Sequence, residues 1–413
     1  MRIALNFQRV DPSKGGAETY VADLCRHLVG SGHRVDLYAS QWSADALPLG
    51  LNAVRVPTSG RTRGARIWNF ARASEDLLSR ADYDCTVGFI NTWATDVLIP
   101  QGGVHQGSLE YNSRRFPAGW KRTAYRLSKR LNPRYGLYRA IESKQYDPRG
   151  TSTIVAVSRF VQGHLERYHR VPPDRIRVIP NAIDAGRLQD ADAATLRHEF
   201  RREHGLTETD VVGLFAGHNF KLKGLPDLLA SLKRRLDRDP SVRPIHLLVC
   251  GGGKIGPYRK TVETLGLSRY VRLIGFAPNV KACYHASDFF VLPSYYDPCS
   301  LVVFEALACG LPVITTSCNG AGEVMTEGRE GFVIPSPCAH EVLADALDRM
   351  TDDDARRAMS RRAAELGRAQ SFDNHVSRLL AVFAEVAARR SSRGTTRIHR
   401  PHTVTAFENR SAS

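Results

Sequence analysis

The chain has 413 residues, a length that suits two domains. Its composition is 42% hydrophobic and 24% charged with 33 Gly and 21 Pro, which excludes a collagen-like, low-complexity or wholly disordered protein. The net charge of +16 suggests a polyanionic partner, either nucleic acid or an anionic membrane. However, residues 111–141 hold nine basic and no acidic side chains, residues 389–413 carry a net +5, and the remaining chain is nearly neutral. This distribution disfavours a general nucleic-acid-binding protein.

The beginning of the chain and its cysteines indicate a cytoplasmic protein. The run MRIALNFQRV is too short for the apolar core of a signal peptide and predicts a first strand. The sequence has no apolar stretch near the ~20 residues that a membrane-spanning helix needs. The eight cysteines are irregularly spaced without a C-x-x-C pair, which favours reduced thiols over a zinc site or a disulfide framework.

Short apolar runs alternate with helical patterns along the whole chain. In the first part we expect helices over 17–32 and 65–80 and strands at 2–7, 34–39, 53–57, 85–90, 152–158 and 175–180. In the second part we expect strands, each followed by a helix, at 211–217, 245–251, 271–276, 288–294, 311–316 and 331–335. This alternation is typical of parallel α/β domains. We therefore predict two doubly wound, Rossmann-like domains.

Proline and glycine in the stretch PNAIDAG, 180–186, indicate where the two domains join. We assign residues 1–183 to the first domain and residues 184–371 to the second. The amphipathic pattern over 372–388 predicts a C-terminal helix that packs back on the first domain. Residues 389–413 are rich in Ser, Thr, Arg and Pro and predict a disordered basic tail.

A Gly-Gly pair, Gly15 and Gly16, joins the first predicted strand to the first predicted helix. Glycine lets the main chain approach a ligand closely, and the N-terminus of a helix favours an anion. The surrounding residues form neither G-x-G-x-x-G nor a P-loop, which disfavours a dinucleotide cofactor. A tight structural turn explains the pair equally well.

Two lysines, Lys221 and Lys223, occur in the corresponding loop of the second domain, just before a predicted helix. Cations at a helix N-terminus are mildly unfavourable, so an anion that neutralises both would explain their position; solvated surface lysines are the alternative. Lys254 follows another strand, in CGGGKIG. Ligands of open α/β sheets bind beyond these strand ends.

The most specific stretch is SYYDPCSLVVFEALACGLPVITT, 294–316, which places Asp297 and Glu305 eight residues apart. Asp297 lies just before a predicted helix and Glu305 in its second turn. Both carboxylates are acceptors suited to sugar hydroxyls, if they point into one cleft. A solvated acid and a helix-surface acid are the alternative.

In this context the chain resembles the family 4 retaining glycosyltransferases, which have the two-domain GT-B fold, and among them the lipopolysaccharide-core glucosyltransferases. The resemblance covers nearly all of residues 1–388. The ordered motifs that carry it are GGAE at 15–18, GVH at 103–105, SRF to PNAID at 158–184, FKLKG at 220–224, the D-x7-E pair, GEVM at 322–325 and GFVIP at 331–335.

The resemblance implies roles for several second-domain residues. Glu305 matches the carboxylate that holds the nucleotide ribose, and Asp297 matches the first acid of the E-x7-E motif, which contacts the donor sugar. Asp297 is one methylene shorter than the usual Glu, which puts the identity of the sugar in question. Lys223 matches the lysine that neutralises the diphosphate, and Lys221 is a candidate for its missing basic companion. With Lys254, these residues form the expected donor site.

Main-chain groups and a first-domain histidine complete the site that the resemblance implies. Gly15 and Gly16 match the turn that faces the diphosphate, and Ser300 and Leu301 match a main-chain amide position near the donor phosphate. His105 matches a histidine that faces the donor sugar and acceptor; taken alone, it would more often be a structural loop residue. We expect the catalytic side chains to be His105, Asp297 and Lys223. Two further acids match family positions and are expected to support or pack the site: Glu142 and Glu323.

The expected reaction is the transfer of a hexose from a nucleotide diphosphate sugar, such as a UDP-sugar, with retention of configuration. The expected acceptor is a glycan or glycolipid of cell-envelope polysaccharide or lipopolysaccharide-type biosynthesis. The sequence shows no Asp-x-Asp in a metal-binding context, so we expect metal-independent catalysis without a cofactor. A transferase with a soluble small-molecule acceptor and a basic nucleic-acid-binding protein are the alternative hypotheses.

The basic segment 111–141 interleaves its cations with aromatic residues, a pattern typical of a protein that lies on an anionic interface. We expect it to bring a monomeric enzyme to the inner face of the cytoplasmic membrane. A solvated basic helix and an acceptor site for phosphorylated glycans are the alternatives.

Overall fold

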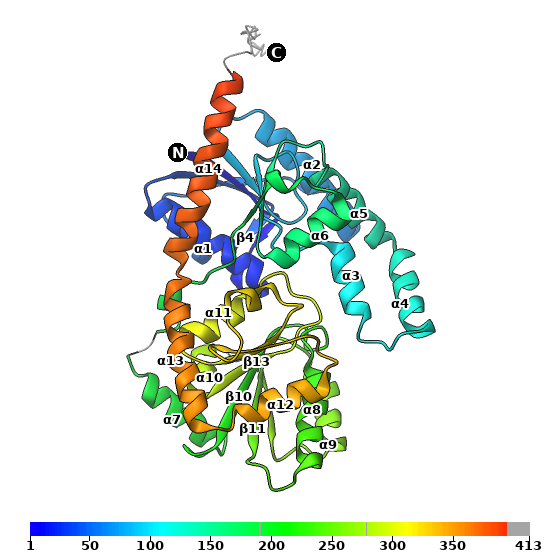
Figure 1. The fold of residues 1–413 in the computed structure, drawn as a ribbon. Helices are drawn as coiled ribbons and strands as arrows, with labels where there is room; N and C mark the ends of the chain where they lie inside the picture. Colours follow the sequence, from blue (N-terminus) through cyan, green and yellow to red (C-terminus); the bar gives the residue numbers. More distant parts are fainter. Residues whose placement is uncertain (190, 278, 395–413) are drawn as a thin grey trace, which may run out of the picture.

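The computed structural model describes residues 1–189, 191–277 and 279–394 and shows two α/β domains, one above the other in Figure 1. The N-terminal domain contains a parallel seven-stranded sheet with the order β5-β3-β1-β6-β7-β8-β9. Its strands are β1 (Arg2–Asn6), β3 (Arg34–Ala39), β5 (Asn52–Arg55), β6 (Cys85–Gly88), β7 (Val97–Leu98), β8 (Thr153–Ala156) and β9 (Ile176–Val178). Its helices are α1 (Gly16–Gly30), α2 (Arg63–Ser79), α3 (His105–Ser113), α4 (Trp120–Arg130), α5 (Pro133–Gln145) and α6 (Arg159–His169).

The C-terminal domain contains a parallel six-stranded sheet with the order β12-β11-β10-β13-β14-β15. Its strands are β10 (Val211–Ala216), β11 (Ile245–Cys250), β12 (Val271–Gly275), β13 (Phe289–Leu292), β14 (Val313–Thr316) and β15 (Gly331–Ile334). Its helices are α7 (Ala193–Glu203), α8 (Leu225–Arg238), α9 (Gly256–Thr264), α10 (Val280–Ala286), α11 (Leu301–Ala308), α12 (His340–Arg349) and α13 (Asp353–Ala369). The prediction of two Rossmann-like domains is confirmed.

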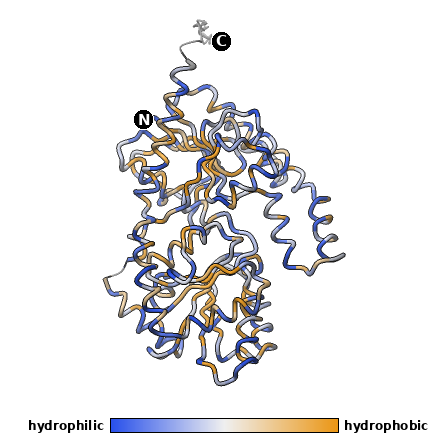
Figure 2. Tube along the Cα trace, in the orientation of Figure 1, coloured by the Kyte–Doolittle hydropathy of each residue, from blue (hydrophilic) through white to orange (hydrophobic). Residues whose placement is uncertain are grey.

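The strands form where the sequence is apolar at consecutive positions, because helices cover both faces of each sheet. All six residues of β10 and all four of β13 are buried. Figure 2 shows the hydrophobic residues concentrated in the strands at the middle of each domain. A short parallel pair that the sequence did not predict, β2 (Arg9–Val10) and β4 (Gln41–Trp42), lies beyond the main N-terminal sheet.

The chain crosses between the domains twice, and the two crossings lie side by side. Ile183, in the first crossing, forms a parallel bridge with Ser371, in the second. Helix α14 (Phe372–Gly394) then runs back along the N-terminal domain, where it contacts α1 and β6 (Figure 1). Its His375 binds Tyr20 Oη at 2.7 Å and the Pro180 carbonyl at 2.9 Å. These bonds tie α14 to α1 and to the first crossing.

Helix α14 continues past the point at which the sequence predicted a disordered tail. The prediction placed the end of the helix at residue 388, whereas the structure continues it to Gly394. An ion pair between Arg389 and Glu385 stabilises its last turns. In addition, Arg390 donates a hydrogen bond to Asp96 of the N-terminal domain at 3.3 Å. The rest of the predicted tail, residues 395–413, lies outside the described residues.

The basic segment folds as helices α4 and α5, and α3 and α4 project from the N-terminal domain at the right of Figure 1. Every residue of α4 is at least partly exposed, including Trp120 at 76% and Leu127 at 56%. Of the helices in the described part of the chain, none has both the length and the apolar character required to cross a bilayer.

Candidate active site

The starts of helices α1 and α11 meet across the two domains. A Cβ atom on Gly16, the first residue of α1, would lie 3.3 Å from Leu301 Cδ1, at the first residue of α11. Neither of these two helices, both fully described, has a side-chain hydrogen bond at its N-cap. Their first N–H groups and the positive ends of their dipoles are therefore available to an anion such as a diphosphate.

The Lys223 ammonium forms an ion pair with the Asp297 carboxylate, which is 7% exposed. The two come from the loops after β10 and β13, which lie in direct contact. Gly224, with φ of +82°, allows this contact, because a Cβ there would lie 1.9 Å from the Pro293 carbonyl oxygen. The structure thus brings together two of the three residues expected to be catalytic.

Glu305 lies in the second turn of α11 and lines a cavity of about 300 Å³ between the domains. The Tyr284 hydroxyl donates to its Oε2 at 2.6 Å. Burial raises the pKa of Glu305, while the Tyr284 hydroxyl and the nearby Arg187 guanidinium act to lower it. Asp297 is not among the residues lining this cavity, so the two acids of the D-x7-E pair do not share it.

His105 is the first residue of α3, and hydrogen bonds to Glu142 fix its position. Both its main-chain N–H, at 2.9 Å, and its Nδ1, at 2.6 Å, bind the same oxygen of Glu142, and its ring stacks on Tyr138 with centroids 4.3 Å apart. Burial alone would raise the pKa of Glu142, but hydrogen bonds from His105 and His169 lower it to about 2. The carboxylate therefore stays ionised and fixes the histidine ring, leaving Nε2 for a ligand.

Tyr296 links the segment that carries His105 to the segment that carries Asp297. Its hydroxyl accepts from the Val104 N–H at 2.9 Å, and Tyr296 and Val104 are the chain neighbours of Asp297 and His105. Gly103, with φ of +68°, makes room for the hydroxyl, since a Cβ there would lie 2.3 Å from it.

Further hydrogen bonds join the two domains near Tyr296. Both oxygens of Glu323, in the C-terminal domain, accept main-chain N–H groups at the start of α6, from Arg159 and Phe160, at 2.7 Å. The Ser158 hydroxyl donates to the Pro298 carbonyl at 2.7 Å. Glu323 is therefore an interdomain cap for α6.

Three residues predicted to bind the donor, Lys221, Lys254 and Ser300, take no part in the interdomain contacts described above. Lys221 and Lys254 are exposed, and neither forms an ion pair within the described residues. The Ser300 N–H already donates to Asn319 Oδ1 at 3.3 Å, so Leu301 provides the first amide of α11 for a ligand.

Sequence reasoning assigned no role at the site to the other charged residues of the Glu305 cavity, which are Asp23, Asp184, Arg187 and Lys281. Arg187, beside the first domain crossing, forms an ion pair with Asp23 of α1, and both line the cavity. Arg26 also binds Asp23, at 2.7 Å. Since Asp23 falls within a helical pattern and Arg187 in a loop, neither has a local signal that distinguishes it from a surface charge.

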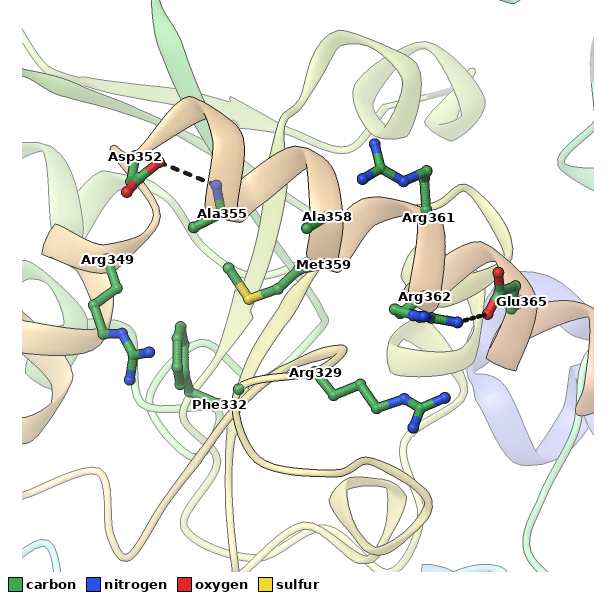
Figure 3. A pocket seen from close by; sticks show the side chains of 11 residues that line it. Arg329, Phe332, Arg349, Asp352, Ala355, Ala358, Met359, Arg361, Arg362 and Glu365 are labelled. Atoms are coloured by element: carbon green, nitrogen blue, oxygen red, sulfur yellow. Dashed lines mark hydrogen bonds and ion pairs between the residues drawn. The ribbon is translucent and has the colours of Figure 1, made fainter.

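A separate cavity of about 610 Å³ lies between β15, α12 and α13, away from every predicted site residue (Figure 3). Its charged groups are largely satisfied: Asp352 caps α13, Arg362 binds Glu365 at 2.9 Å, and Arg349 lies over the Phe332 ring. The cavity has the character of a surface groove.

The site region is rich in positive groups rather than in metal-binding side chains. Within residues 1–189, 191–277 and 279–394, His, Cys, Asp and Glu side chains form no group of three or more that could hold a metal ion. The positive groups near the site are instead Lys223, Arg187 and the helix N-termini.

Two Rossmann-like domains that face each other across a polar interdomain cavity define the GT-B class. The solved structure of WaaG, a glycosyltransferase involved in lipopolysaccharide biosynthesis, shares this fold, with a TM-score of 0.75 over 92% of this chain and 99% of that one at 21% identity. The fold is also shared by Anabaena HepE in complex with UDP, with a TM-score of 0.66 over 93% of this chain and 100% of that one at 16% identity.

The chain is a glycosyltransferase, and one glycosyltransferase family model matches each of its two domains. Residues 14–187 match the Glycosyltransferase Family 4 model, and residues 197–366 match the model of Glycosyl transferases group 1. The lipopolysaccharide glucosyltransferase WaaG of Escherichia coli K12 is 24% identical over 336 residues, 81% of this chain and 85% of the relative. A D-inositol 3-phosphate glycosyltransferase of Corynebacterium glutamicum is 31% identical over 242 residues, and the chain spans only 57% of that relative's length. These matches replace the nucleic-acid-binding hypothesis.

Proposed function

We propose that this glycosyltransferase moves a hexose from a UDP-sugar to a glycan or glycolipid acceptor of cell-envelope or lipopolysaccharide-type biosynthesis, with retention of configuration. The observation that carries the proposal is the Lys223–Asp297 ion pair, on the C-terminal side of the domain junction where the uncapped starts of α1 and α11 meet. The relation to WaaG supports the acceptor class, and the shared fold of HepE, solved with UDP and with UDP-glucose, supports the donor class.

In this proposal the C-terminal domain holds the donor and the N-terminal domain holds the acceptor. Negative charge develops on the diphosphate as the glycosidic bond breaks, and the Lys223 ammonium and the helix amides stabilise it. Asp297 is in an ion pair and Glu142 is bound by two histidines, so neither is poised as a nucleophile. Attack of the acceptor on the same face from which the diphosphate leaves accounts for retention. Because fixed positive groups supply the electrostatic stabilisation, we propose that no metal ion is required.

Slow hydrolysis of nucleotide sugars tests this proposal without knowledge of the acceptor. We expect one UDP-sugar to be hydrolysed in preference to its GDP- and ADP-counterparts, at the same rate with and without EDTA, when nucleotide release is followed. Hydrolysis of none of them would contradict the donor class. A loss of activity in EDTA that Mg²⁺ or Mn²⁺ restores would contradict the metal-independent mechanism.

We further propose that α4 docks on an anionic membrane and that the enzyme works as a monomer at the cytoplasmic face. Trp120 and Leu127 of α4 and Leu131, which caps its C-terminus, recur at helical spacing on one side and are 76%, 56% and 74% exposed. Five of the other positions of α4 hold cations: Lys121, Arg122, Arg126, Lys129 and Arg130. A narrow apolar stripe beside a wide cationic face is the pattern of a helix that lies in a membrane interface. Each cation near an anionic surface adds about 1 kcal/mol of attraction.

Vesicle co-sedimentation tests this surface. The protein should sediment with vesicles containing phosphatidylglycerol and remain in solution with phosphatidylcholine alone. Replacing Trp120, Leu127 and Leu131 together by alanine should weaken binding roughly 10-fold or more, since about 2 kcal/mol of burial per large apolar side chain is lost. The matched control is Leu49→Ala, because Leu49 is 97% exposed in a different part of the domain. Equal sedimentation of the triple variant and the unchanged protein would favour a soluble acceptor and a solvated basic helix.

A further inference from the structure

A third cavity, of about 610 Å³ and distinct from the two described above, lies in the N-terminal domain at the carboxyl ends of its parallel strands. Residues following β1, β3 and β6 line it, together with the start of α2 and one residue of α5. The order β5-β3-β1-β6 shows that the chain leaves β1 in one direction and returns to its other side with β6. This is the topological switch point at which open α/β sheets bind ligands.

Three arginines from two separate elements line this cavity. Arg9 follows β1, and its guanidinium lies 3.7 Å from the Glu18 carboxylate. Arg63 and Arg66 lie in the first turn of α2, and no carboxylate of the described residues forms an ion pair with either. Cations in the first turn oppose the helix dipole, so folding alone does not favour their position. With Glu18 ionised, the four side chains give the cavity a net charge of +2.

The cavity adjoins the proposed catalytic groups on two sides. Tyr138, which lines it, stacks on the His105 ring at 4.3 Å. Glu18, which also lines it, lies beside the Gly-Gly turn, since a Cβ on Gly15 would be 3.0 Å from Glu18 Oε2. A molecule in this cavity would therefore lie next to both the histidine and the turn that faces the donor.

The wall of the cavity also includes a residue with unusual backbone geometry. Asn91, in the loop after β6, has φ of +60°, in the left-handed region that asparagine adopts more readily than most residues other than glycine. Its amide group can both donate to and accept from sugar hydroxyls.

We propose that this cavity is the acceptor subsite and that Arg9, Arg63 and Arg66 bind a phosphomonoester carried by the acceptor sugar. The proposal rests on the glycosyltransferase function above and narrows its acceptor to phosphorylated glycans or glycolipids. A phosphomonoester carries close to two negative charges at pH 7 and three acceptor oxygens, which match the cavity's charge of +2 and its three guanidinium groups. A carboxylate, with one charge, would leave part of the positive charge unneutralised.

Isothermal titration calorimetry on the full chain, without nucleotide, tests the subsite with four probes: glucose 6-phosphate, inorganic phosphate, glucuronate and glucose. We expect both phosphates to bind, glucuronate more weakly, and glucose without measurable heat. In the double variant Arg63→Ala/Arg66→Ala the affinity for glucose 6-phosphate should fall at least about tenfold, because two charge-assisted interactions are removed. The control is Arg61→Ala, which removes an arginine that is exposed like Arg63 and Arg66 but does not line the cavity.

The outcomes separate this proposal from the proposed function. UDP binding, measured in the same variants, should not change, because the arginines belong to the acceptor side. If UDP binds but neither phosphate does, or if the double variant and Arg61→Ala bind glucose 6-phosphate equally, the phosphate subsite is wrong and the transferase assignment stands. Tighter binding of glucuronate than of glucose 6-phosphate would also overturn it, in favour of an acidic sugar. Failure of UDP to bind the unchanged protein would instead count against the proposed donor.

Discussion

Replacing Lys223 by alanine is expected to lower kcat for nucleotide-sugar turnover by roughly 10²–10³-fold, the usual effect of removing one group that stabilises developing charge. Lys223 is the cation that the structure holds beside Asp297, and Lys221 and Lys254 are exposed. We therefore expect neither of them to compensate for its loss. Steady-state assays of UDP-sugar hydrolysis would measure the effect. The matched control is Lys233→Ala, which removes a partly exposed lysine of α8 whose ion-pair partner among the described residues is Asp237.

The same substitution has a cost in stability that can be separated from catalysis. Without Lys223, the buried Asp297 carboxylate loses its ion pair, which should reduce the free energy of unfolding by about 1–3 kcal/mol. The double variant Lys223→Ala/Asp297→Asn removes the unpaired charge and should regain thermal stability without regaining activity. If the double variant regained activity as well, Lys223 would have a structural role only. Full activity in Lys223→Ala itself would overturn the assignment of the site.

Replacing Glu305 by alanine is expected to lower kcat/KM for the donor by about 10²-fold or more. Tyr284 occupies Oε2, so Oε1 is the oxygen available to the ribose hydroxyls. A hydrogen bond to a charged group contributes about 1.5–3 kcal/mol, and a tenfold change corresponds to about 1.4 kcal/mol. The structure places this carboxylate in an interdomain cavity of about 300 Å³, beside Leu301 at the start of α11.

A comparison of two nucleotides can show that Glu305 acts on the ribose. The unchanged protein should bind UDP much more tightly than 2′,3′-dideoxy-UDP, and Glu305→Ala should bind the two almost equally, as measured by calorimetry. The control is Glu341→Ala, which removes an exposed carboxylate of α12 that binds Arg234 and Arg238. If Glu305→Ala kept the preference for UDP, the carboxylate would not contact the ribose hydroxyls.

The fold could be predicted because each main strand is a local signal. Residues buried on both faces must be apolar at consecutive positions, as in β10 and β13, and such runs are visible without knowledge of their neighbours. The two-residue strands β2, β4 and β7 are too short to produce that signal. The end of α14 was misplaced because its last turns depend on Asp96, almost 300 residues earlier in the chain.

The site was predictable only where a motif places the residues within a few turns of one another, as for Asp297 and Glu305. The pairing of Lys223 with Asp297 depends on the packing of two loops through Gly224, which no local pattern reveals. The arginines at the start of α2 resemble any exposed basic residues in the sequence. Only the fold brings Arg63 and Arg66 to the same cavity as Arg9, more than 50 residues earlier.

The return of α14 to the N-terminal domain has a consequence for the order of folding. Residues 184–371 form a continuous domain, whereas the N-terminal domain lacks its last helix until Phe372–Gly394 has been synthesised. At about 5–20 residues per second, roughly 10–40 s separate the synthesis of β9 from that of α14. During that interval the surface of α1 that carries Tyr20 remains uncovered. The domain synthesised first is therefore completed last, and loss of the C-terminal helix during translation would expose the N-terminal domain rather than the C-terminal domain to misfolding.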